Sequence, residues 1–402
     1  MTRMDAGNTA ERKVLISGAS ISGPALAYWL HRSGFAVTVV EKAGALRGGG
    51  YPIDIRGTAT EVVRRMGILP RLQDAHIDSR RYTFLNADGS IAASVPGAVA
   101  GNAEGQDLEV RRGDLAAALY AIVRDDVEFL FNDSIDTLDQ SEQGVDVTFR
   151  GGLRRTFDLV VGADGMHSYT REALFGPEER FHRYLGYCFA IFTMPNTFGL
   201  SRELMMWNAP GKAAALYAVG ENDELHAFLN FHRPEPPFDA LRNPDAQRDL
   251  VARVFADAGW EVPGMLSAMR DADDLFFDTA GQIRMPHWSS GRVALVGDAA
   301  YAPSFLTGQG SSLALVGAYT LAHSLATNRD HTAAFAAYER NMRAFVGVNQ
   351  ALVDNGAATL FPTTPQALEQ RNTMLRSLVT MPSATTRPEH SAITLPEFAP
   401  MS

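Results

Sequence analysis

The sequence predicts an α/β protein into which an antiparallel sheet is inserted. Residues 13–41 read as strand, glycine-rich turn, helix and strand. Residues 180–275 instead give consecutive strand-like runs with no helical pattern until residue 244, which marks a separate antiparallel sheet. The α/β pattern returns from residue 291 and is followed by further helical segments. These observations indicate a Rossmann-like domain with an inserted antiparallel-sheet domain and a C-terminal helix.

Length and composition narrow the protein class. The 402 residues suggest roughly two to three domains. A net charge of −10 argues against nucleic acid and against an anionic membrane surface as partners. The one cysteine, Cys188, excludes an internal disulfide and a cysteine-built metal site, and its apolar neighbours favour a buried thiol. No signal sequence or membrane-spanning run is apparent, so a cytoplasmic protein is expected.

The turn after the first strand has the sequence GASISG at residues 18–23. Gly18 can adopt the backbone angles of the turn, and Gly23 lets the next helix pack close to the sheet. Ser20 stands in place of the middle glycine, where its Cβ would push a phosphate slightly outward while its hydroxyl could donate to it. Glu41 ends the second strand, where an acid accepts a hydrogen bond from a ribose hydroxyl. This context predicts a dinucleotide site at the helix N-terminus rather than a structural turn.

The remaining segments follow in order. Three glycines at 48–50 leave room for a flat ligand, and a flexible surface loop is the alternative. The next expected elements are a strand at 51–55, a helix at 60–66, a hairpin at 82–97, a helix that begins within 110–119, short strands at 126–150 and a strand at 157–163. Beyond the inserted sheet, helices are expected at 244–259, 309–326, 331–360 and 365–381. The tail from residue 382 is rich in Pro, Ser and Thr and is expected to be disordered.

Three separated motifs resemble those of one family. They are the GASISG turn, the stretch Asp164-Gly165 with Ser168 and Arg171, and the stretch from Gly297 to Gly310. Because all three motifs occur in the order and spacing of the family, the sequence resembles the single-component flavoprotein aromatic hydroxylases of the para-hydroxybenzoate hydroxylase type, over about residues 12–380. Within that family it is most similar to the tetracycline-inactivating monooxygenases, on the stretch 49–57, RGDL at 112–115, GDAAYAPSFLTGQG at 297–310 and the added C-terminal helix.

The resemblance implies FAD and NADPH as cofactors. The expected FAD-binding residues are Gly18, Ser20, Gly23, Glu41, Lys42, Asp54, Arg112 and Asp298. Arg47 matches a position implicated in NADPH binding, and Asp164 would link the FAD and NADPH regions indirectly. Gly308, Gln309 and Gly310 are the expected catalytic residues, because their backbone N–H groups would lie near the pyrimidine edge of the flavin and stabilise its reduced, anionic form.

The resemblance also implies a reaction. NADPH would reduce FAD, and one oxygen from O2 would pass through a flavin C4a-hydroperoxide to a small polycyclic aromatic substrate, with tetracycline as the leading candidate. A polyketide-tailoring hydroxylase, amine oxidation, epoxidation and a low-turnover flavin protein that only binds a polycyclic ligand remain open. Neither the spacing of a hydrolase nucleophile nor that of metal-ligating histidines is present, so no metal is expected. A monomer or a dimer is expected.

Side chains of the inserted sheet are the expected walls of the substrate site. They are Phe192, Met205, Trp207 and Phe231, with Phe189 and Phe228 beside them and Arg233 as a polar anchor. Any of them could instead be core, because alternate strand residues must bury against something. Tyr301, Phe305 and Ser312 depart from the family pattern, in which His, Pro and Asn are frequent. Tyr301 could be a packed aromatic or take a direct role.

The elements and the resemblance together give expected domain boundaries. The FAD-binding domain is expected at 12–81, 106–179 and 276–330. The substrate domain is expected to consist of a hairpin at 82–105 and a sheet at 180–275, followed by C-terminal helices at 331–381 and the tail at 382–402.

Overall fold

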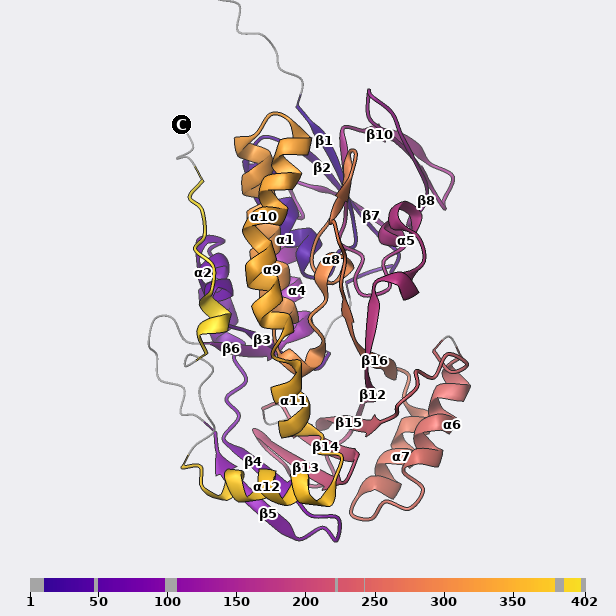
Figure 1. Ribbon diagram of the computed structural model, residues 1–402, viewed down its shortest axis with the longest axis vertical. Coiled ribbons are helices and arrows are strands. Elements are labelled where there is room, and N and C mark those ends of the chain that lie inside the picture. Colours follow the sequence, from indigo (N-terminus) through magenta and orange to yellow (C-terminus); the bar gives the residue numbers. More distant parts are fainter. Residues whose placement is uncertain are drawn as a thin grey trace, which may run out of the picture.

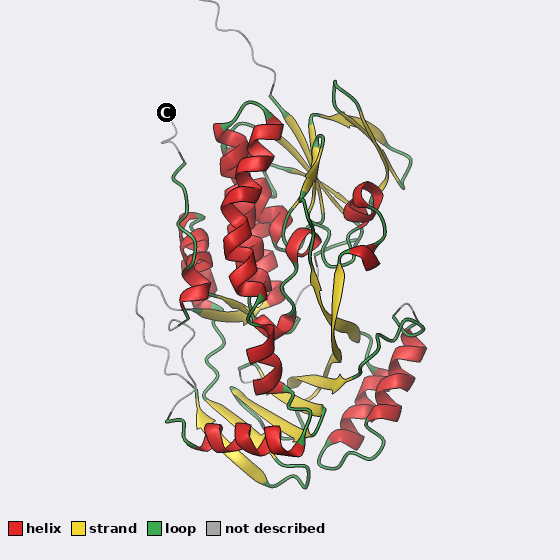
Figure 2. Cartoon of the chain, viewed as in Figure 1, coloured by secondary structure: helices red, strands yellow, loops and turns green. Residues whose placement is uncertain are grey.

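The computed structural model describes residues 11–46, 50–97, 107–220, 223–241, 243–379 and 387–398. Two sheet-based parts follow one another along the long axis of the molecule (Figure 1). The upper part holds a mostly parallel sheet, and the lower part holds a larger sheet with helices on both faces (Figure 2). The predicted α/β fold with an inserted sheet domain and C-terminal helices is confirmed.

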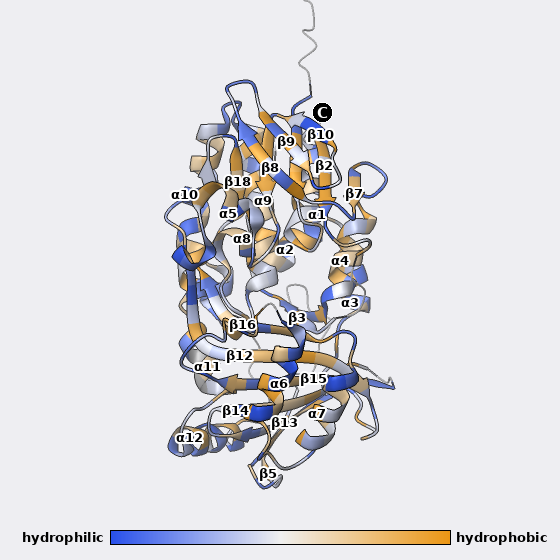
Figure 3. Ribbon diagram, turned by 90° about the vertical axis from the view of Figure 1, so that its right-hand side faces the viewer, coloured by the Kyte–Doolittle hydropathy of each residue, from blue (hydrophilic) through white to orange (hydrophobic). Residues whose placement is uncertain are grey.

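Within the described residues the upper sheet has six strands. In spatial order they are β17 (Ser289–Ser290), β18 (Val293–Leu295), β11 (Leu159–Gly162), β1 (Lys13–Ser17), β2 (Ala36–Glu41) and β7 (Glu128–Phe131). All neighbours are parallel except β17 and β18. Val14, Leu15 and Ile16 of β1 are fully buried, and burial on both faces is typical of a parallel sheet. The hydropathy colouring of Figure 3 shows apolar residues concentrated on these strands.

Helices cover one face of the upper sheet, and a small antiparallel sheet covers the other. The helices are α1 (Ser22–Arg32), α2 (Thr58–Arg65), α3 (Leu69–Asp74), α4 (Arg112–Ala121), α9 (Gly310–Thr327) and α10 (His331–Gln350). The small sheet consists of β8 (Ile135–Gln140), β9 (Val145–Phe149) and β10 (Arg154–Phe157). Helix α9 packs against α1, α2 and α10 and is buried along most of its length, so it is the central helix of this part. Two short helices, α5 (Tyr169–Phe175) and α8 (Asp298–Tyr301), follow β11 and β18.

The lower sheet has seven described strands. In spatial order they are β16 (Phe276–Ile283), β12 (His182–Pro195), β15 (Glu224–His232), β14 (Lys212–Ala218), β13 (Glu203–Ala209), β4 (Arg81–Leu85) and β5 (Ile91–Pro96). The sheet is antiparallel except where β4 runs parallel to β13. Strands β4 and β5 form the predicted hairpin. The boundary expected at residue 276 is wrong, because β16 pairs with β12 and so belongs to the lower sheet.

Different helices cover the two faces of the lower sheet. Helices α6 (Pro244–Val254) and α7 (Val262–Asp271) pack on one face, and the sequence did not predict α7. Helices α11 (Val353–Leu360) and α12 (Pro365–Arg376) pack on the other face, with α11 next to the upper part and α12 at the far end of the molecule, near β5 (Figure 1). The single helix expected at 331–360 is therefore two helices. A two-stranded sheet, β3 (Pro52–Ile55) with β6 (Leu108–Arg111), lies between the two parts. Among the described residues, every helix is too short or too polar to cross a lipid bilayer.

The prediction of a disordered tail is wrong for residues 387–398. Pro388–Ser391 form a short 3₁₀ helix, and His390 and Leu395 are buried. Phe398 stacks on Trp29 of α1 with ring centroids 5.1 Å apart and an interplanar angle of 12°. The composition of the tail is polar on average, but its few apolar residues meet a complementary apolar surface. The rest of the predicted tail lies outside the described residues.

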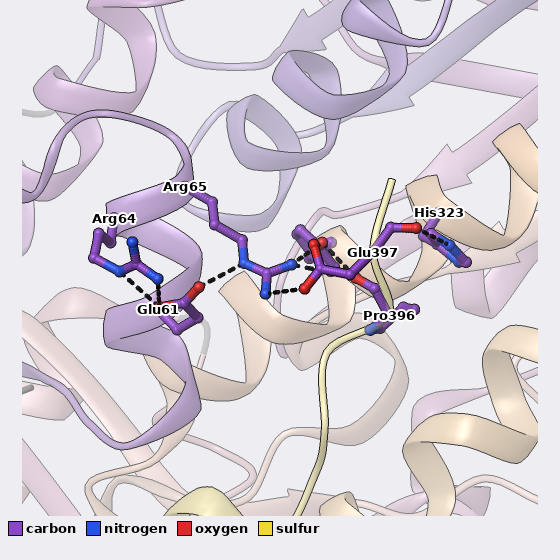
Figure 4. A network of polar contacts seen from close by, with 7 residues as sticks. Glu61, Arg64, Arg65, His323, Pro396 and Glu397 are labelled. Carbon is purple, nitrogen blue, oxygen red and sulfur yellow. Dashed lines mark hydrogen bonds and ion pairs between the residues drawn. The ribbon is translucent and has the colours of Figure 1, made fainter. Parts of the chain in front are cut away.

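Polar contacts hold the same segment against the helices of the upper part (Figure 4). Arg65 of α2 forms ion pairs with Glu61 at 2.6 Å and with Glu397 at 2.7 Å. The Tyr319 hydroxyl of α9 donates to the Pro396 carbonyl oxygen at 2.6 Å. Residues 387–398 therefore join α1, α2 and α9 from outside, and we call them the C-terminal strap.

Candidate active site

The turn between β1 and α1 requires glycine at both ends. A Cβ on Gly18 would lie 2.5 Å from the Ala163 carbonyl oxygen, and one on Gly23 would lie 1.9 Å from the Gly18 carbonyl oxygen. Gly18 also has φ of +107°, which L side chains rarely adopt. The turn is thus closed tightly against the end of β11, and the first N–H groups of α1 remain available to an anion.

Glu41 lies beside this turn at the end of β2. Its Oε2 accepts a hydrogen bond from the Ala19 N–H at 2.8 Å, and its Oε1 accepts one from the Ala43 N–H at 2.9 Å. These bonds fix the carboxylate next to the turn while leaving further lone pairs for a ribose hydroxyl. Lys42 is exposed to solvent.

Three polar residues from distant parts of the sequence meet beside the turn. The Arg112 guanidinium donates to the Ser20 Oγ at 3.0 Å. Burial raises the pKa of Asp298, and the nearby positive charge of Arg112 opposes that rise. The replacement of the middle glycine by Ser20 therefore supplies a hydrogen-bond partner for Arg112. Arg47, the expected NADPH contact, lies outside the described residues.

The loop before α9 approaches β3. Gly308 has φ of +63°, and a Cβ on it would lie 2.9 Å from the Asp54 Oδ2. Asp54 forms an ion pair with Arg56 at 2.8 Å, and the Arg56 N–H donates to the Ser312 Oγ at 3.0 Å. Ser312 thus joins the loop to β3, a role that the sequence did not suggest.

Gln309 is fully buried at the start of α9. Its Nε2 donates to the Gly308 carbonyl oxygen at 3.3 Å, but its Oε1 has no hydrogen-bond partner among the described residues. A buried polar atom without a partner costs free energy, so such an atom marks a position where a ligand group is expected. Together with the closed turn and the charged pair Arg112 and Asp298, this atom fits a dinucleotide that runs from α1 to α9.

A second polar cluster follows β11. Asp164 accepts hydrogen bonds from the Thr170 N–H at 3.0 Å and the Thr170 hydroxyl at 2.9 Å, which fixes the start of α5. Arg171 is fully buried, donates to the Ala299 carbonyl oxygen at 3.1 Å and pairs with Glu178 at 2.6 Å. The described contacts of Asp164 are thus structural, and its expected indirect link to NADPH stays a prediction.

His167 in this cluster gives a pH-dependent stability prediction. Hydrogen bonds to Asp278 and Glu178 raise its pKa from 6.5 to about 10. Because the folded-state pKa exceeds the unfolded value, the stabilisation is complete below about pH 6.5 and is lost as the pH rises through 10. The imidazole is 56% exposed, so solvent screens its ionic contacts. They therefore contribute about 1 kcal/mol or less to the free energy of unfolding.

We therefore expect His167→Gln to lower the free energy of unfolding at pH 6 more than at pH 10.5. Urea unfolding of both proteins at the two pH values measures the difference. His31→Gln is a matched control, since His31 is exposed near the end of α1. Equal losses for His167→Gln at both pH values would contradict the ionic role of His167.

The predicted substrate residues lie on the wrong face of the lower sheet. Phe192, Met205, Trp207 and Phe231 pack in one core cluster with residues of α6 and α7. The Arg233 Nε donates to the Glu235 carbonyl oxygen at 3.0 Å, and Arg233 lines a cavity of about 410 Å³ on the α6 side. Phe192, Met205, Trp207 and Phe231 are therefore corrected to core positions, because side chains alternate across a strand and the sequence could not show which face was turned to the upper part. Arg233, just after β15, lies on the same α6 side.

The neighbouring positions of the same strands face the upper part. The Phe189 ring centroid lies 4.5 Å from that of Phe305 and 5.8 Å from that of Phe276. Phe276 in turn stacks on Tyr51 at 6.3 Å, just before β3. Phe305 directly precedes the Gly308 loop and is 38% exposed. Four aromatic side chains, which we call the aromatic group, therefore lie between the loop at residues 308–310 and the lower sheet: Tyr51, Phe189, Phe276 and Phe305. We call residues 308–310 the flavin loop.

Tyr301 is a packed aromatic. It is 1% exposed, its ring centroid lies 4.7 Å from that of Trp288, and its hydroxyl accepts from Tyr338 at 3.0 Å. A Cβ on Gly317 would lie 1.8 Å from the Tyr301 hydroxyl oxygen, so this glycine makes room for the ring. Of the two roles left open, the structure shows the packing role. Cys188 is buried as predicted.

Sequence reasoning missed the polar face of the β3–β6 sheet. In β6 the apolar residues Leu108 and Val110 pack into the upper core, while Glu109 and Arg111 alternate with them. Asp54 is the register partner of Glu109, so it lies on the same face. The alternation in LEVR was a visible signal of this two-sided strand.

The chain matches known flavoproteins over most of its length. The model of the FAD binding domain family matches residues 11–355. A flavin-dependent monooxygenase from an unknown prokaryotic organism is 37% identical over 390 residues, which cover 96% of this chain and 99% of the relative. The crystal structure of tetracycline destructase Tet(55) superposes with a TM-score of 0.84 at 35% identity, over 96% of this chain and 99% of that one. Tetracycline destructase Tet(51) gives a TM-score of 0.83 at 32% identity, over 97% and 100%.

The family model covers well over half of the chain, and the monooxygenase relative is matched almost end to end. The closed turn, the neighbouring side chains of Arg112 and Asp298, and the buried Gln309 amide are compatible with a bound FAD. The chain therefore belongs to the FAD binding domain family and is an FAD-dependent monooxygenase.

Proposed function

We propose that this enzyme takes electrons from NADPH and transfers one oxygen atom from O2 to a small polycyclic aromatic substrate, with tetracycline as the first compound to test. The proposal is supported most by the aromatic group formed by Tyr51, Phe189, Phe276 and Phe305 beside the flavin loop. Bound FAD supplies the redox chemistry and the activation of oxygen. The similarity to two tetracycline destructases supports the choice of probe.

The protein side chains would have three tasks. Gly18, Gly23, Glu41, Arg112 and Asp298 would hold the cofactor against the upper sheet. Backbone N–H groups at 308–310 would lie at the flavin edge, where the α9 N-terminus favours negative charge. The aromatic group would hold a flat ring against the flavin and exclude water from it.

The test measures NADPH consumption by the FAD-loaded protein in air, with and without tetracycline, followed by a mass spectrum of the drug. We expect faster consumption and a product carrying one added oxygen atom. Faster consumption with an unaltered drug would mean that tetracycline only triggers flavin reduction. If tetracycline does not stimulate NADPH consumption, it is excluded as the substrate, and biosynthetic polyketides are tested next. Parallel runs with NADH establish the nucleotide preference.

Phe305→Ala tests the aromatic group directly. We expect the KM for the aromatic substrate to rise roughly tenfold, because ring contacts contribute on the order of 1 kcal/mol beyond their buried area. Phe238→Ala is the matched control, since Phe238 is 68% exposed on the α6 side of the lower sheet. Equal effects of the two substitutions would contradict this placement of the substrate.

A further inference from the structure

Two consecutive arginines at the end of β6 point to opposite partners. Arg112 donates to Ser20 in the dinucleotide turn. Arg111 instead reaches the lower sheet, where its Nη2 donates to the Val219 carbonyl oxygen at 3.3 Å. Arg111 is the last residue of β6 and Arg112 the first of α4, so the two cations leave the chain where it changes from strand to helix, one toward the lower sheet and one toward the turn.

One hydrogen-bond donor of the Arg111 guanidinium has no acceptor among the described residues. Its Nε is buried and has no hydrogen-bond partner among the residues that the structure describes. Its contact with Val219 is long for a charged donor, since charge-assisted bonds are usually about 2.7–2.9 Å. A buried donor of this kind costs free energy unless a ligand completes it. Nε and the adjacent Nη form the side-on fork that binds two oxygens of a planar acidic group.

His226 lies close enough to Arg111 to be affected by its charge. His226 of β15 lies on the same face of the lower sheet as Tyr217, its register partner. Burial lowers the pKa of His226, and the positive charge of Arg111 lowers it further. His226 is therefore mainly neutral at pH 7, so it can donate or accept a hydrogen bond without adding a second charge.

Glu109, on the same face of β6, does not supply the missing anion. Its Oε2 accepts from the Ser79 hydroxyl at 3.3 Å, and its carboxyl also contacts the Tyr217 hydroxyl. Burial and the neighbouring Asp54 raise the pKa of Glu109, which disfavours its charged form. Its polar atoms are also occupied by Ser79 and Tyr217 rather than by Arg111.

We propose that Arg111, assisted by His226, is a specificity-determining residue that binds an acidic oxygen group of the substrate, either a carboxylate or an ionised enol. The proposal rests on the proposed function, because it places the substrate between β6 and the lower sheet. It narrows the substrate class to polycyclic aromatics that carry an acidic oxygen group. Arg111 orients the ring by this group while the aromatic residues around Phe305 contact its faces.

The test compares two probes that share one ring system, anthracene-2-carboxylate and anthracene-2-carboxamide. Their binding to the FAD-loaded protein is titrated without NADPH by the change in the flavin absorption spectrum. The wild type is expected to bind the carboxylate roughly tenfold more tightly than the amide, the scale of one charge-assisted hydrogen bond. Arg111→Gln is expected to abolish this preference, and Arg111→Lys to retain part of it, because lysine keeps the charge but not the fork.

Two controls separate this role from others. Arg111→Gln is expected to keep its FAD content and its KM for NADPH, whereas Arg112→Gln is expected to lose FAD. Arg154→Gln, which alters an exposed arginine on β10, is expected to retain the full carboxylate preference. An unchanged preference in Arg111→Gln, or an equal loss of affinity for both probes, would overturn the proposal.

The binding test is independent of turnover. A carboxylate preference that depends on Arg111, in a protein that transfers no oxygen to any aromatic acid, would leave the anion site standing and remove the proposed function. Oxygen transfer to a neutral ring with the same efficiency in wild type and in Arg111→Gln would retain the function and remove the anion site.

Discussion

Gly23→Ala is expected to give a protein that purifies with less than about a tenth of the wild-type FAD content. The added Cβ would lie 1.9 Å from the Gly18 carbonyl oxygen, a backbone atom that cannot move without opening the turn between β1 and α1. Overpacking of this kind typically costs about 1–3 kcal/mol in stability, occasionally more. Loss of the closed turn also removes the N–H groups that would face the pyrophosphate. The ratio of absorbance at the flavin and protein bands measures the FAD content.

Gly264→Ala is the matched control for this substitution. Gly264 lies in α7, and among the described residues no atom outside its chain neighbours and the backbone of its own helix lies within 4 Å of the position of its missing Cβ. Alanine there is expected to be neutral or to stabilise the helix by up to about 1 kcal/mol, with the FAD content unchanged. A Gly23→Ala protein with full FAD content would contradict the tight approach of the turn to α1.

Removal of the C-terminal strap by truncation after residue 386 is expected to destabilise the upper part by about 3 kcal/mol. The truncation uncovers the sites of the buried Leu395 and His390, removes the Phe398 ring from Trp29 and breaks the ion pair of Arg65 with Glu397. For a chain of 402 residues, this corresponds to a fall in Tm of about 4 °C. Thermal unfolding followed by intrinsic fluorescence measures the fall.

Glu397→Gln separates the apolar and ionic contributions of the strap. Glu397 is 78% exposed, so its ion pair with Arg65 is worth at most about 1 kcal/mol. The substitution is expected to shift Tm by less than a third of the change caused by truncation. An unchanged Tm after truncation would show that the strap does not stabilise α1, α2 and α9.

The candidate cofactor-binding turn could be predicted from the sequence because the residues that define it are close together along the chain. The turn at 18–23 is flanked by its strand and helix, and Gly18, Gly23 and Glu41 lie within one βαβ unit. Arg112 and Asp298 came from the family resemblance, which implied contacts with the cofactor, and the structure places the Arg112 guanidinium at Ser20 in the turn. The role of Ser20 as a partner for Arg112 could not be predicted, because it depends on a contact between distant segments.

The candidate substrate-binding side chains could not be predicted from the sequence, because they depend on which face of each lower-sheet strand is turned toward the upper part. The period of two along β12 was evident, but Phe189 and Phe192 are both aromatic and lie on opposite faces. Only the placement of α6 and α7 shows that Phe192 belongs to the core. The prediction of a disordered tail was wrong for a related reason. It used the average composition of residues 382–402, which does not reveal the individual contacts of Leu395 and Phe398.

The C-terminal strap has a consequence for the order in which the protein can be completed during synthesis. Trp29 and Phe398, which covers it, are 369 positions apart in the sequence, and α9 and the strands of the lower sheet lie between them. The outer side of α1 therefore stays uncovered on the ribosome while the lower sheet and α9 are still being made. Long-range contacts of this kind form slowly and leave apolar surface open to other chains in the meantime. The strap is thus expected to cover this side of α1 only after α9 and the lower sheet, which precede it in the sequence, have been made.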